Sequence, residues 1–523
     1  MKRSAPPVIF TDDCWIFTAG AGVTAADLKA KVVDGYAGTG GALWWSTGDH
    51  EVYLYETEIG EIFGADSDAL DPTSPSFVHS ATPGIESQLA ANLRQLIADS
   101  GGPLTALSDL CRNAGIPFFP RVRVNSHYVI DPAHPGYGSF RRENPELLIG
   151  RPGEIFPENS VQWGIRSGLD FAHAAVRDHV YRIACETFER FDVDGVELDF
   201  MRHSAFFRME ESLANAYLMT DLVARIKARL DAVSAKRGKR LQLAVRVPPT
   251  LADSKRIGLD VAHWIRAGLV DIAVVGGGFI SFETPVDEFV RAAADTPCLI
   301  YGCIEATRHM DRHFLRALAL RWLTDGADGI YLYNFFSMAP EWNRQTAAEF
   351  SDLATLKKLD KRYEISPTLP FSPTEGHSAA FRHAHPSTQL PVPLPADADL
   401  GPTLTIRVSD EIQEVTGSLA LRLQNLAPDD RLEVRLNSHA LSWDRAQVNF
   451  DGWMRQQVAT LFWANYPTYP QEQKMEGISA EYAIDDSILV QGVNEIEVQL
   501  KSNHRANQTT LTGVELSIAH AKS

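Results

Sequence analysis

The sequence predicts an α/β protein, a (β/α)8 TIM barrel followed by a C-terminal antiparallel β-sandwich domain. Residues 1 to about 365 alternate strand-like and helix-like segments, which is typical of a parallel sheet with crossover helices. Eight strand-like segments in this length match a barrel with inserted loops. Beyond residue 377 the pattern changes to short alternating runs with weak helical periodicity, as in a sandwich.

The barrel strands are predicted from short apolar runs bounded by polar or turn-forming residues. In chain order they are expected at 7–13, 41–45, 117–124, 195–199, 241–247, 272–275, 298–303 and 329–333. The clearest helical patterns between them lie at 85–98, 175–191, 211–235, 286–294 and 312–324. Residues 127–168 are too long for a simple connection, and such loops are usually functional.

Recurring prolines predict the domain boundary. Pro367, Pro370 and Pro373 stand among small and polar residues, which is typical of a linker. The expected division is therefore a barrel over 1–365, a linker over 366–376 and a sandwich over 377–523. Sandwich strands are expected at 404–408, 418–423, 431–436, 481–485, 494–500 and 514–520.

The composition excludes several classes of partner. The 523 residues carry a formal net charge of -18, so the basic face that non-specific nucleic-acid binding needs is not expected. The five cysteines are widely scattered, unlike a disulfide framework. The N-terminus shows no signal peptide and no segment approaches the ~18 apolar residues of a membrane helix. We therefore expect a cytoplasmic protein with neither a nucleic-acid nor a membrane partner.

The fourth predicted strand, residues 195–199, carries the strongest functional pattern. Its apolar residues alternate with Glu197 and Asp199, so one face is apolar and the other acidic. Arg202 and His203 follow just beyond its end. Ionisable groups inside and at the C-terminal tip of a strand are what the active site of a barrel needs.

Polar and aromatic residues also stand at the ends of other predicted strands, which meet at one mouth of a barrel. The candidates for substrate contact are Asp12, Asp13, Trp45, Arg123, Asn125, His127, Arg202, His203, Arg246, Tyr333 and Asn334. Any one of them could instead anchor a loop, pack in the core or neutralise the barrel interior. The ensemble favours a site, because burying charges from four or more strands without a task is costly.

Carboxylates, arginines and aromatics without a metal or phosphate motif indicate sugar chemistry. Glycoside hydrolysis needs a carboxylic acid that protonates the leaving oxygen and a second carboxylate that acts as nucleophile or as base for water. Asp199 and Glu305, on the fourth and seventh strands, lie across the mouth, and the predicted catalytic residues are Asp199, Glu305 and Glu197. No P-loop, dinucleotide-binding glycine motif or His-Glu-x-x-His motif is present, so neither a cofactor nor a metal is expected.

Three segments carry a family resemblance: DGVELDFMR at 194–202, SFRRENPE at 139–146 and LDFAHAAVRD at 169–178. With these segments the chain resembles the glycosyl-hydrolase-like barrel proteins of bacteria known as family-10-type glycosyl hydrolases. The resemblance covers about residues 8 to 350. It implies a (β/α)8 barrel with a carbohydrate site.

A second resemblance concerns position alone. In the large clan of retaining β-glycosidases the acid/base stands at the end of the fourth strand and the nucleophile at the end of the seventh, and Asp199 and Glu305 are similar in place. This resemblance implies a retaining mechanism. The chain departs from the clan because its fourth strand lacks an Asn-Glu pair. An α-glycosidase-like arrangement, with Asp199 as nucleophile, therefore stays open.

Two other functions compete with glycoside hydrolysis. One is a glycoside or polysaccharide lyase, in which His127 or Tyr333 is the base and arginines neutralise a uronate; the arginines concerned are Arg121, Arg123, Arg202 and Arg246. The other is a non-catalytic barrel that binds carbohydrate. Reaction products separate the three, because hydrolysis incorporates water, elimination makes an unsaturated sugar and binding makes neither.

Overall fold

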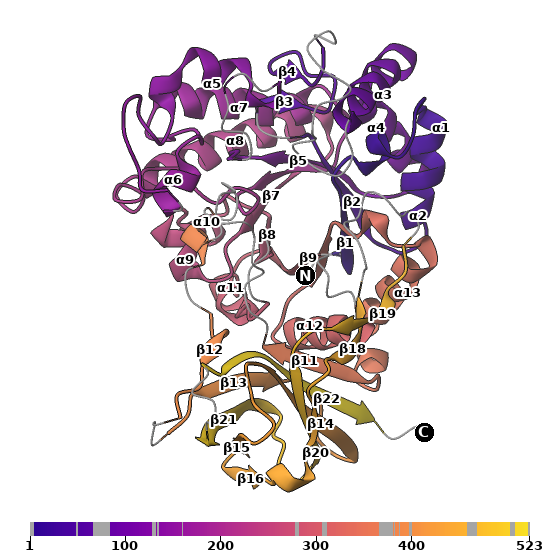
Figure 1. Cartoon of the computed structure of the whole chain (residues 1–523). Helices are drawn as coiled ribbons and strands as arrows, with labels where there is room; N and C mark the ends of the chain where they lie inside the picture. The colour runs from indigo at the N-terminus through magenta and orange to yellow at the C-terminus, as the bar shows by residue number, and fades with distance from the viewer. Residues whose placement is uncertain are drawn as a thin grey trace.

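The computed structural model shows a barrel with a smaller β-rich region beside it (Figure 1). It describes all residues except 1–4, 49–50, 66–83, 128–131, 133–134, 159, 278–281, 306–310, 366–379, 381, 386–387, 397–399, 458–467, 503–507 and 521–523. The predicted linker at 366–376 lies outside the described residues.

Eight parallel strands close into a barrel in the order β1-β10-β9-β8-β7-β6-β5-β2, which confirms the predicted fold class. They are β1 (Val8–Asp12), β2 (Ala42–Ser46), β5 (Phe118–Arg123), β6 (Gly195–Asp199), β7 (Gln242–Val247), β8 (Ile272–Val275), β9 (Leu299–Glu305) and β10 (Gly329–Tyr333). Each overlaps a predicted strand. β9 runs two residues past its expected end and so includes Glu305. Two short strands, β3 (Val52–Tyr53) and β4 (Glu61–Ile62), form a separate small sheet after β2.

Helices surround the barrel (Figure 1). They are α1 (Ala25–Asp27), α2 (Asp34–Tyr36), α3 (Ile85–Ser100), α4 (Pro103–Ala114), α5 (Ser139–Glu143), α6 (Val161–Ile165), α7 (Ala174–Glu189), α8 (Ala216–Arg237), α9 (Leu251–Arg256), α10 (Val261–Arg266), α11 (Val286–Ala292), α12 (Arg312–Thr324), α13 (Pro340–Ser351) and α14 (Leu353–Leu356). Side-chain caps set several starts; the Asp311 carboxylate accepts from the first N–H groups of α12. Within the described residues, no helix combines the length and apolar character needed to cross a bilayer.

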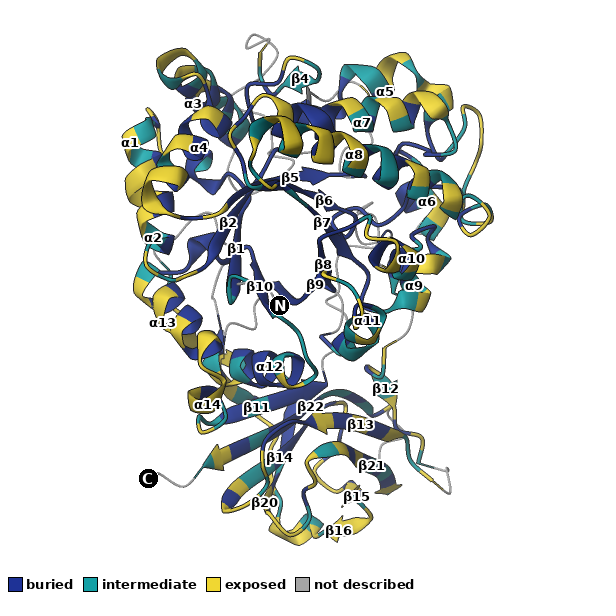
Figure 2. Cartoon of the chain, turned by 180° about the vertical axis from the view of Figure 1, so that it is seen from behind, coloured by how far each residue is buried: buried dark blue, intermediate teal, exposed yellow. Residues whose placement is uncertain are grey.

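The two faces of the barrel strands belong to different cores. Outward side chains pack against the helices, and examples are Phe10, Leu43, Val122, Leu198 and Val245. Inward side chains form a separate cluster inside the barrel, with Ile9, Trp44, Phe119, Ala244 and Tyr331 among them. Figure 2 shows the result: the strands are buried throughout, while the helices expose only their outer faces. The period of two along each strand therefore sorts its residues between the two cores.

The C-terminal region consists of antiparallel sheets. One has the order β11-β22-β14-β20-β17 and the other β13-β21-β15-β16. Their strands are β11 (Lys361–Ile365), β13 (Thr403–Val408), β14 (Val415–Gln424), β15 (Arg431–Leu436), β16 (His439–Leu441), β17 (Gln447–Asn449), β20 (Ile478–Asp485), β21 (Gly492–Ser502) and β22 (Thr510–His520), with β12 (Val392–Pro393) beside β22. A hairpin of β18 (Trp453–Gln457) and β19 (Gln471–Met475) stands apart from both sheets.

Strand β11 lies at the end of the expected barrel domain, but its hydrogen bonds join it to the sandwich. β11 pairs with β22 along its whole length, from Lys361–Ile518 to Ile365–Val514. A boundary at residue 365 therefore falls one strand too late, because a sequence pattern does not show which distant strand β11 will join. The hydrogen bonding places the change of domain just before Lys361.

Among the described residues, the sandwich contacts the barrel at several places, two of which bear on domain docking and on the barrel rim. Beside α12, Arg362 pairs with Asp311 at 3.2 Å and Arg407 pairs with Asp325 at 2.7 Å. Near the end of β10, the backbone N–H of Thr468 donates to the Ser337 carbonyl at 2.9 Å, and that of Ala339 donates to the Thr468 carbonyl at 3.0 Å. The second contact ties the chain leading into β19 to the barrel rim.

Candidate active site

Charged side chains from five barrel strands or their ends, with a tyrosine from a sixth strand, converge inside the C-terminal end of the barrel. We call this group the arginine–carboxylate cluster, and its members are Asp13, Arg121, Arg123, Glu197, Asp199, Arg202, Arg246, Glu305 and Tyr333. All are at least nine-tenths buried. The structure thus brings together eight of the residues predicted for this site, and it adds Arg121, which the sequence analysis named only for a lyase, and the neighbouring Tyr331.

Asp199 is the most heavily hydrogen-bonded member. Arg246 binds both of its oxygens, with Nε donating to Oδ1 and Nη2 to Oδ2, each at 2.9 Å. Nη1 of Arg121 donates to Oδ2 at 2.9 Å, and the backbone N–H groups of Met201 and Arg202 donate to Oδ1 at 3.0 Å. These charges and donors outweigh burial and lower the pKa of Asp199. The carboxylate is therefore ionised and surrounded by donors.

Tyr333 lies between the two arginines that hold Asp199. The guanidinium carbons of Arg121 and Arg246 stand 4.6 Å and 4.0 Å from the centre of its ring. Arg121 also donates to the Tyr333 hydroxyl at 2.7 Å. Cation–π contact and the hydrogen bond together fix the positions of both guanidiniums.

Glu197 lies on the same face of β6, two residues before Asp199, but the two carboxyls differ in protonation state. The Tyr331 hydroxyl donates to its carboxyl at 2.8 Å, and the nearest contact from Arg121 is Nε at 3.9 Å. Burial, followed by the charge of Asp199, raises the pKa of Glu197 to about 8. Glu197 therefore holds a proton at neutral pH while Asp199 does not.

Replacing Glu197 by glutamine is expected to keep the fold and to flatten the pH dependence of stability between about pH 5 and 8. The carboxyl titrates near 4.5 when unfolded and at about 8 when folded, so in this window only the folded state holds the proton. The free energy of unfolding of the parent therefore falls as pH rises, whereas glutamine has no proton to lose. Urea unfolding at several pH values measures both slopes. Equal slopes would mean that Glu197 is already ionised at neutral pH.

Asp13 and Glu305 are the other two carboxylates of the cluster; Asp13 directly follows β1, and Glu305 is the last residue of β9. Asp13 pairs with Arg121 through one oxygen and with Arg123 through the other, the second at 2.9 Å. The charges of Arg123, Arg121 and Arg202 lower its pKa well below the usual range against the opposing effect of burial. Glu305 faces Nη1 of Arg246 at 3.8 Å. The Asp13 side chain is 5% exposed, whereas those of Glu197, Asp199 and Glu305 are fully buried.

Two predicted site residues lie on the outer face of the barrel strands. Trp45 packs in the outer core with its ring edge-on to Phe17 at 6.2 Å, and Trp44 takes the interior instead. This corrects the expectation that Trp45 contacts substrate. The strand residues from Ala42 to Trp45 are apolar at both sets of alternating positions, so the sequence does not indicate which set faces the interior of the barrel. Asp12 alternates with the inward Asp13, and burial raises its pKa.

Asn125 and Asn334 hold backbone in place. The Asn125 amide donates to the carbonyls of Leu169 and Ala205 and accepts from the Leu169 N–H, so it fastens the loops after β5 and β6. Asn334 has a left-handed backbone, with φ of 62°, and its N–H donates to the hydroxyl of Thr11. For Asn125 this matches the alternative weighed from sequence, a loop anchor.

The two predicted histidines contact each other beneath the loops. The backbone N–H of His127 donates to Nδ1 of His203 at 3.0 Å. Burial, followed by the charge of Arg141, lowers the pKa of His127 to about 3. His127 is fully buried, and a Cβ on Gly168 would overlap its ring. His127 is therefore a packed, neutral histidine.

Tyr331 is the residue that the sequence analysis did not single out. It binds Glu197 inside the barrel and packs edge-on to Trp44 at 5.3 Å between ring centres. Tyr331 lies two residues before Tyr333 on β10, so both side chains point to the same face of the strand, and this spacing could have identified it from the sequence. No group of three or more potential metal ligands occurs among the residues that the structure describes.

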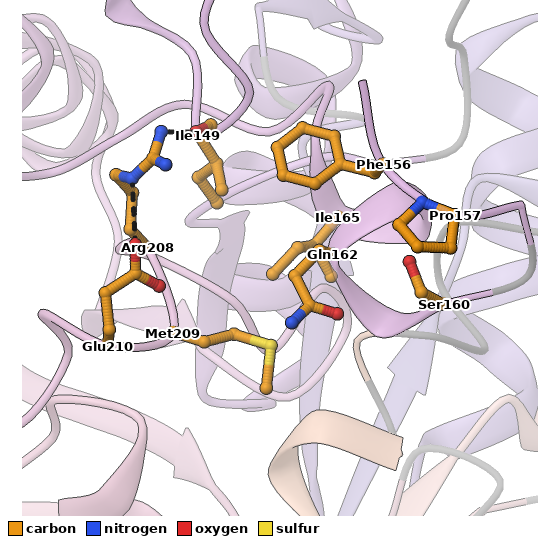
Figure 3. A pocket seen from close by; sticks show the side chains of 9 residues that line it. All are labelled: Ile149, Phe156, Pro157, Ser160, Gln162, Ile165, Arg208, Met209 and Glu210. Atoms are coloured by element: carbon orange, nitrogen blue, oxygen red, sulfur yellow. Dashed lines mark hydrogen bonds and ion pairs between the residues drawn. The ribbon is translucent and has the colours of Figure 1, made fainter. Parts of the chain in front are cut away.

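A cavity of about 280 Å³ opens on the loops beyond β5 and β6 (Figure 3). Its apolar wall includes Ile149, Phe156, Ile165 and Met209, and Arg208 stands at one edge with its guanidinium toward Glu210 and the Ile149 carbonyl. None of the cluster residues lines it. A second cavity, of about 150 Å³, lies between the barrel and the sandwich near Arg321 and Arg407.

No protein-family model matches the chain, and no curated protein matches its sequence. The resemblance to the family-10-type proteins therefore stays a prediction. Distant similarities to solved structures exist. The GH36 α-galactosidase AgaA from Geobacillus stearothermophilus is 11% identical with a TM-score of 0.39, covering 99% of this chain and 56% of that one.

Two further solved structures are about as dissimilar to this chain in sequence and in structure. The galactosidase domain of the α-galactosidase–sucrose kinase AgaSK is 13% identical with a TM-score of 0.37, covering 92% of this chain and 54% of that one. The chitinase ChiW from Paenibacillus sp. is 10% identical with a TM-score of 0.39, covering 98% and 56%. This chain spans little more than half the length of each. Similarities this distant transfer neither an activity nor a site residue.

Proposed function

We propose that the chain is a glycoside hydrolase whose active site is the arginine–carboxylate cluster. The observation that supports this most is the convergence of ionisable side chains from different strands at the C-terminal end of the barrel, where barrel enzymes have their sites. Carboxylates of differing protonation state stand there together, as acid–base chemistry requires. The proposed partner is a carbohydrate or glycoside substrate.

The proposed catalytic pair is Glu305 with Asp13. Asp199, predicted from sequence for this role, is a poor nucleophile because five donors engage its oxygens, and a poor acid because its pKa is low. Glu197 is an acid at neutral pH, but it lies fully buried beneath Asp199. Asp13 is the most exposed carboxylate of the cluster, and the ion pair of Glu305 with Arg246 is a longer 3.8 Å. Asp13 follows β1 and Glu305 ends β9, and β10 lies between these two strands.

The two carboxyls have different proposed roles. Asp13, between two guanidiniums, is the ionised carboxylate that attacks the anomeric carbon or activates water. Glu305, whose contact with Arg246 is a longer 3.8 Å, is the group that protonates the leaving oxygen. We keep the retaining course as the proposal, with Asp13 as nucleophile. The positional resemblance to retaining β-glycosidases implies the exchanged assignment, with Glu305 as nucleophile.

Alanine variants of both residues test the assignment. Once a screen of nitrophenyl glycosides has found a substrate, Asp13→Ala and Glu305→Ala are each expected to lose at least about 1,000-fold in kcat/KM, roughly 4 kcal/mol of barrier. With added azide, Asp13→Ala should give a glycosyl azide of inverted configuration and Glu305→Ala one of retained configuration. The opposite pair of products would exchange the roles.

Asp12→Asn is the matched control, because it alters the adjacent carboxyl, which lies on the outer face of β1. It is expected to keep activity within about threefold of the parent, well under 1 kcal/mol of barrier. Full activity in both alanine variants would remove Asp13 and Glu305 from the mechanism. If no glycoside is hydrolysed by the parent, the hydrolase proposal fails.

A lyase is the less favoured candidate, although the arginines would suit a uronate. Its proposed bases are unsuitable: the pKa of His127 is too low to take a proton at neutral pH, and burial raises the pKa of Tyr333. Ultraviolet absorbance of an unsaturated sugar product would nevertheless establish elimination. Sugar binding without either product would establish the non-catalytic barrel.

A further inference from the structure

The cavity of about 280 Å³ in Figure 3 is built by two loops that follow neighbouring barrel strands. The loop after β5 contributes Ile149, Phe156, Pro157, Ser160, Gln162 and Ile165, and the loop after β6 contributes Arg208, Met209 and Glu210. Asn125 holds the two loops together, because its amide donates to the carbonyls of Leu169 and Ala205 at 2.9 Å and 2.8 Å. The walls of the cavity are therefore fixed to each other.

The inner wall of the cavity is apolar. Ile149 and Ile165 are buried in one small cluster, and Met209 packs against it. Figure 3 shows the Phe156 ring, Ile165 and the Met209 thioether around the same space. A thioether makes favourable contacts with an aromatic ring. An apolar cavity of about 150 Å³ already holds a benzene molecule, so this one has room for two fused rings.

The edge of the cavity offers no free positive charge. Arg208 is the cationic residue among those that line it, and its guanidinium pairs with Glu154 at 2.8 Å and with Glu210 at 3.2 Å. Two carboxylates around one guanidinium leave the edge acidic, so an anion is not favoured there. Gln162 is an exposed residue of the lining, and its amide can both donate and accept hydrogen bonds.

Exposed apolar side chains are concentrated in the same part of the barrel. Ile155, beside Phe156, is 95% exposed, and Leu213 and Tyr217, which follow the second loop, are 60% and 67% exposed. Elsewhere in the described part of the barrel, the most exposed large apolar side chain is that of Leu353, at 40%. Apolar surface gathered around a cavity is typical of a binding site.

We propose that this cavity binds a neutral aromatic molecule of one or two rings that carries a hydroxyl group or a ring N–H. The rings lie against Phe156, Ile165 and Met209, and the polar group reaches the Gln162 amide. The volume sets the size of the ligand, the apolar wall its aromatic character, and the paired charges of Arg208 its neutrality. None of the arginine–carboxylate cluster lines the cavity, so the proposal does not depend on the hydrolase.

The first test titrates the full chain with indole and with 2-naphthol, followed by calorimetry and by ligand-observed NMR. Both probes are expected to bind saturably, with Kd of about 1 mM or tighter. The anion 2-naphthalenesulfonate and the non-aromatic cyclohexanol are each expected to bind at least about tenfold more weakly. The absence of saturable binding by both probes, or binding of the sulfonate or of cyclohexanol as tight as that of 2-naphthol, would overturn the proposal.

The second test fills the cavity from within. Met209→Trp is expected to raise the Kd of indole at least about tenfold, because the larger side chain takes the space of the ligand. Gln162→Trp fills the cavity from an exposed position and serves if Met209→Trp does not fold. Met454→Trp is the matched control, since Met454 lies on β18 and is 57% exposed, and it should bind indole like the parent. An unchanged Kd in a folded cavity variant would place the probe elsewhere and refute the proposal.

The oligomeric state gives a further check on the kind of occupant. Light scattering is expected to show the same mass for the parent and for Met209→Trp. A parent dimer that Met209→Trp dissociates would make the cavity an interface between two copies of the chain, which contradicts the proposal. Because every readout here is binding or mass, a failure to hydrolyse any glycoside would leave this inference standing.

Discussion

Replacing Asp199 by asparagine is expected to destabilise the whole barrel, by roughly 3–5 kcal/mol. The carboxylate joins Arg121 and Arg246 in the interior, and all three side chains are fully buried. Asparagine would leave two buried guanidiniums without their shared negative charge, and its NH2 group would face donors. Chemical unfolding followed by circular dichroism measures the loss.

Glu197→Gln is the matched control for this prediction. It removes a carboxyl from the same face of the same strand, but one that is neutral at pH 7, so the expected change is below about 1 kcal/mol. A fully stable Asp199→Asn protein that has lost activity would contradict our interpretation. It would return Asp199 to the catalytic role predicted from the sequence.

Removing the C-terminal domain is expected to give a chain that is largely insoluble. A chain that ends at residue 360 loses β11 and the sandwich, and it exposes the face of α12 that packs on them. Ala317 of α12 is part of the sandwich core, and Asp311 and Asp325 lose Arg362 and Arg407. An exposed apolar face bordered by unpaired charges favours aggregation. The soluble fraction after expression, compared with the full chain, measures the effect.

Thr468→Pro in the full chain separates domain docking from the contact at the rim. Proline removes the N–H that donates to Ser337 but leaves the α12 interface intact, so the variant should remain soluble.

A soluble and active chain ending at residue 360 would show that the barrel is an independent unit. The sandwich would then be dispensable for both folding and the site.

The sequence by itself determined the barrel and the side of each strand on which most of the site lies. Alternation of apolar and ionisable residues along β6 places Glu197 and Asp199 inside, and the same parity places Arg121, Arg123 and Arg246 with them. This worked because the side-chain direction on a strand depends only on local geometry. At Trp44 and Trp45 both alternating sets of residues are apolar, so the pattern does not show which side chain faces the barrel interior. The prediction that Trp45 lies in the site was therefore wrong.

Only the tertiary structure decided what each inward residue does. Glu197 and Asp199 are nearly equivalent in sequence, yet Tyr331 binds one and two arginines bind the other. Their protonation therefore depends on partners from β5, β7 and β10. The partner of β11, the anchoring role of Asn125 and the burial of His127 likewise depend on residues distant in the chain. Hydrogen-bond partners and desolvation are properties of the assembled fold, because they arise where strands remote in sequence come together.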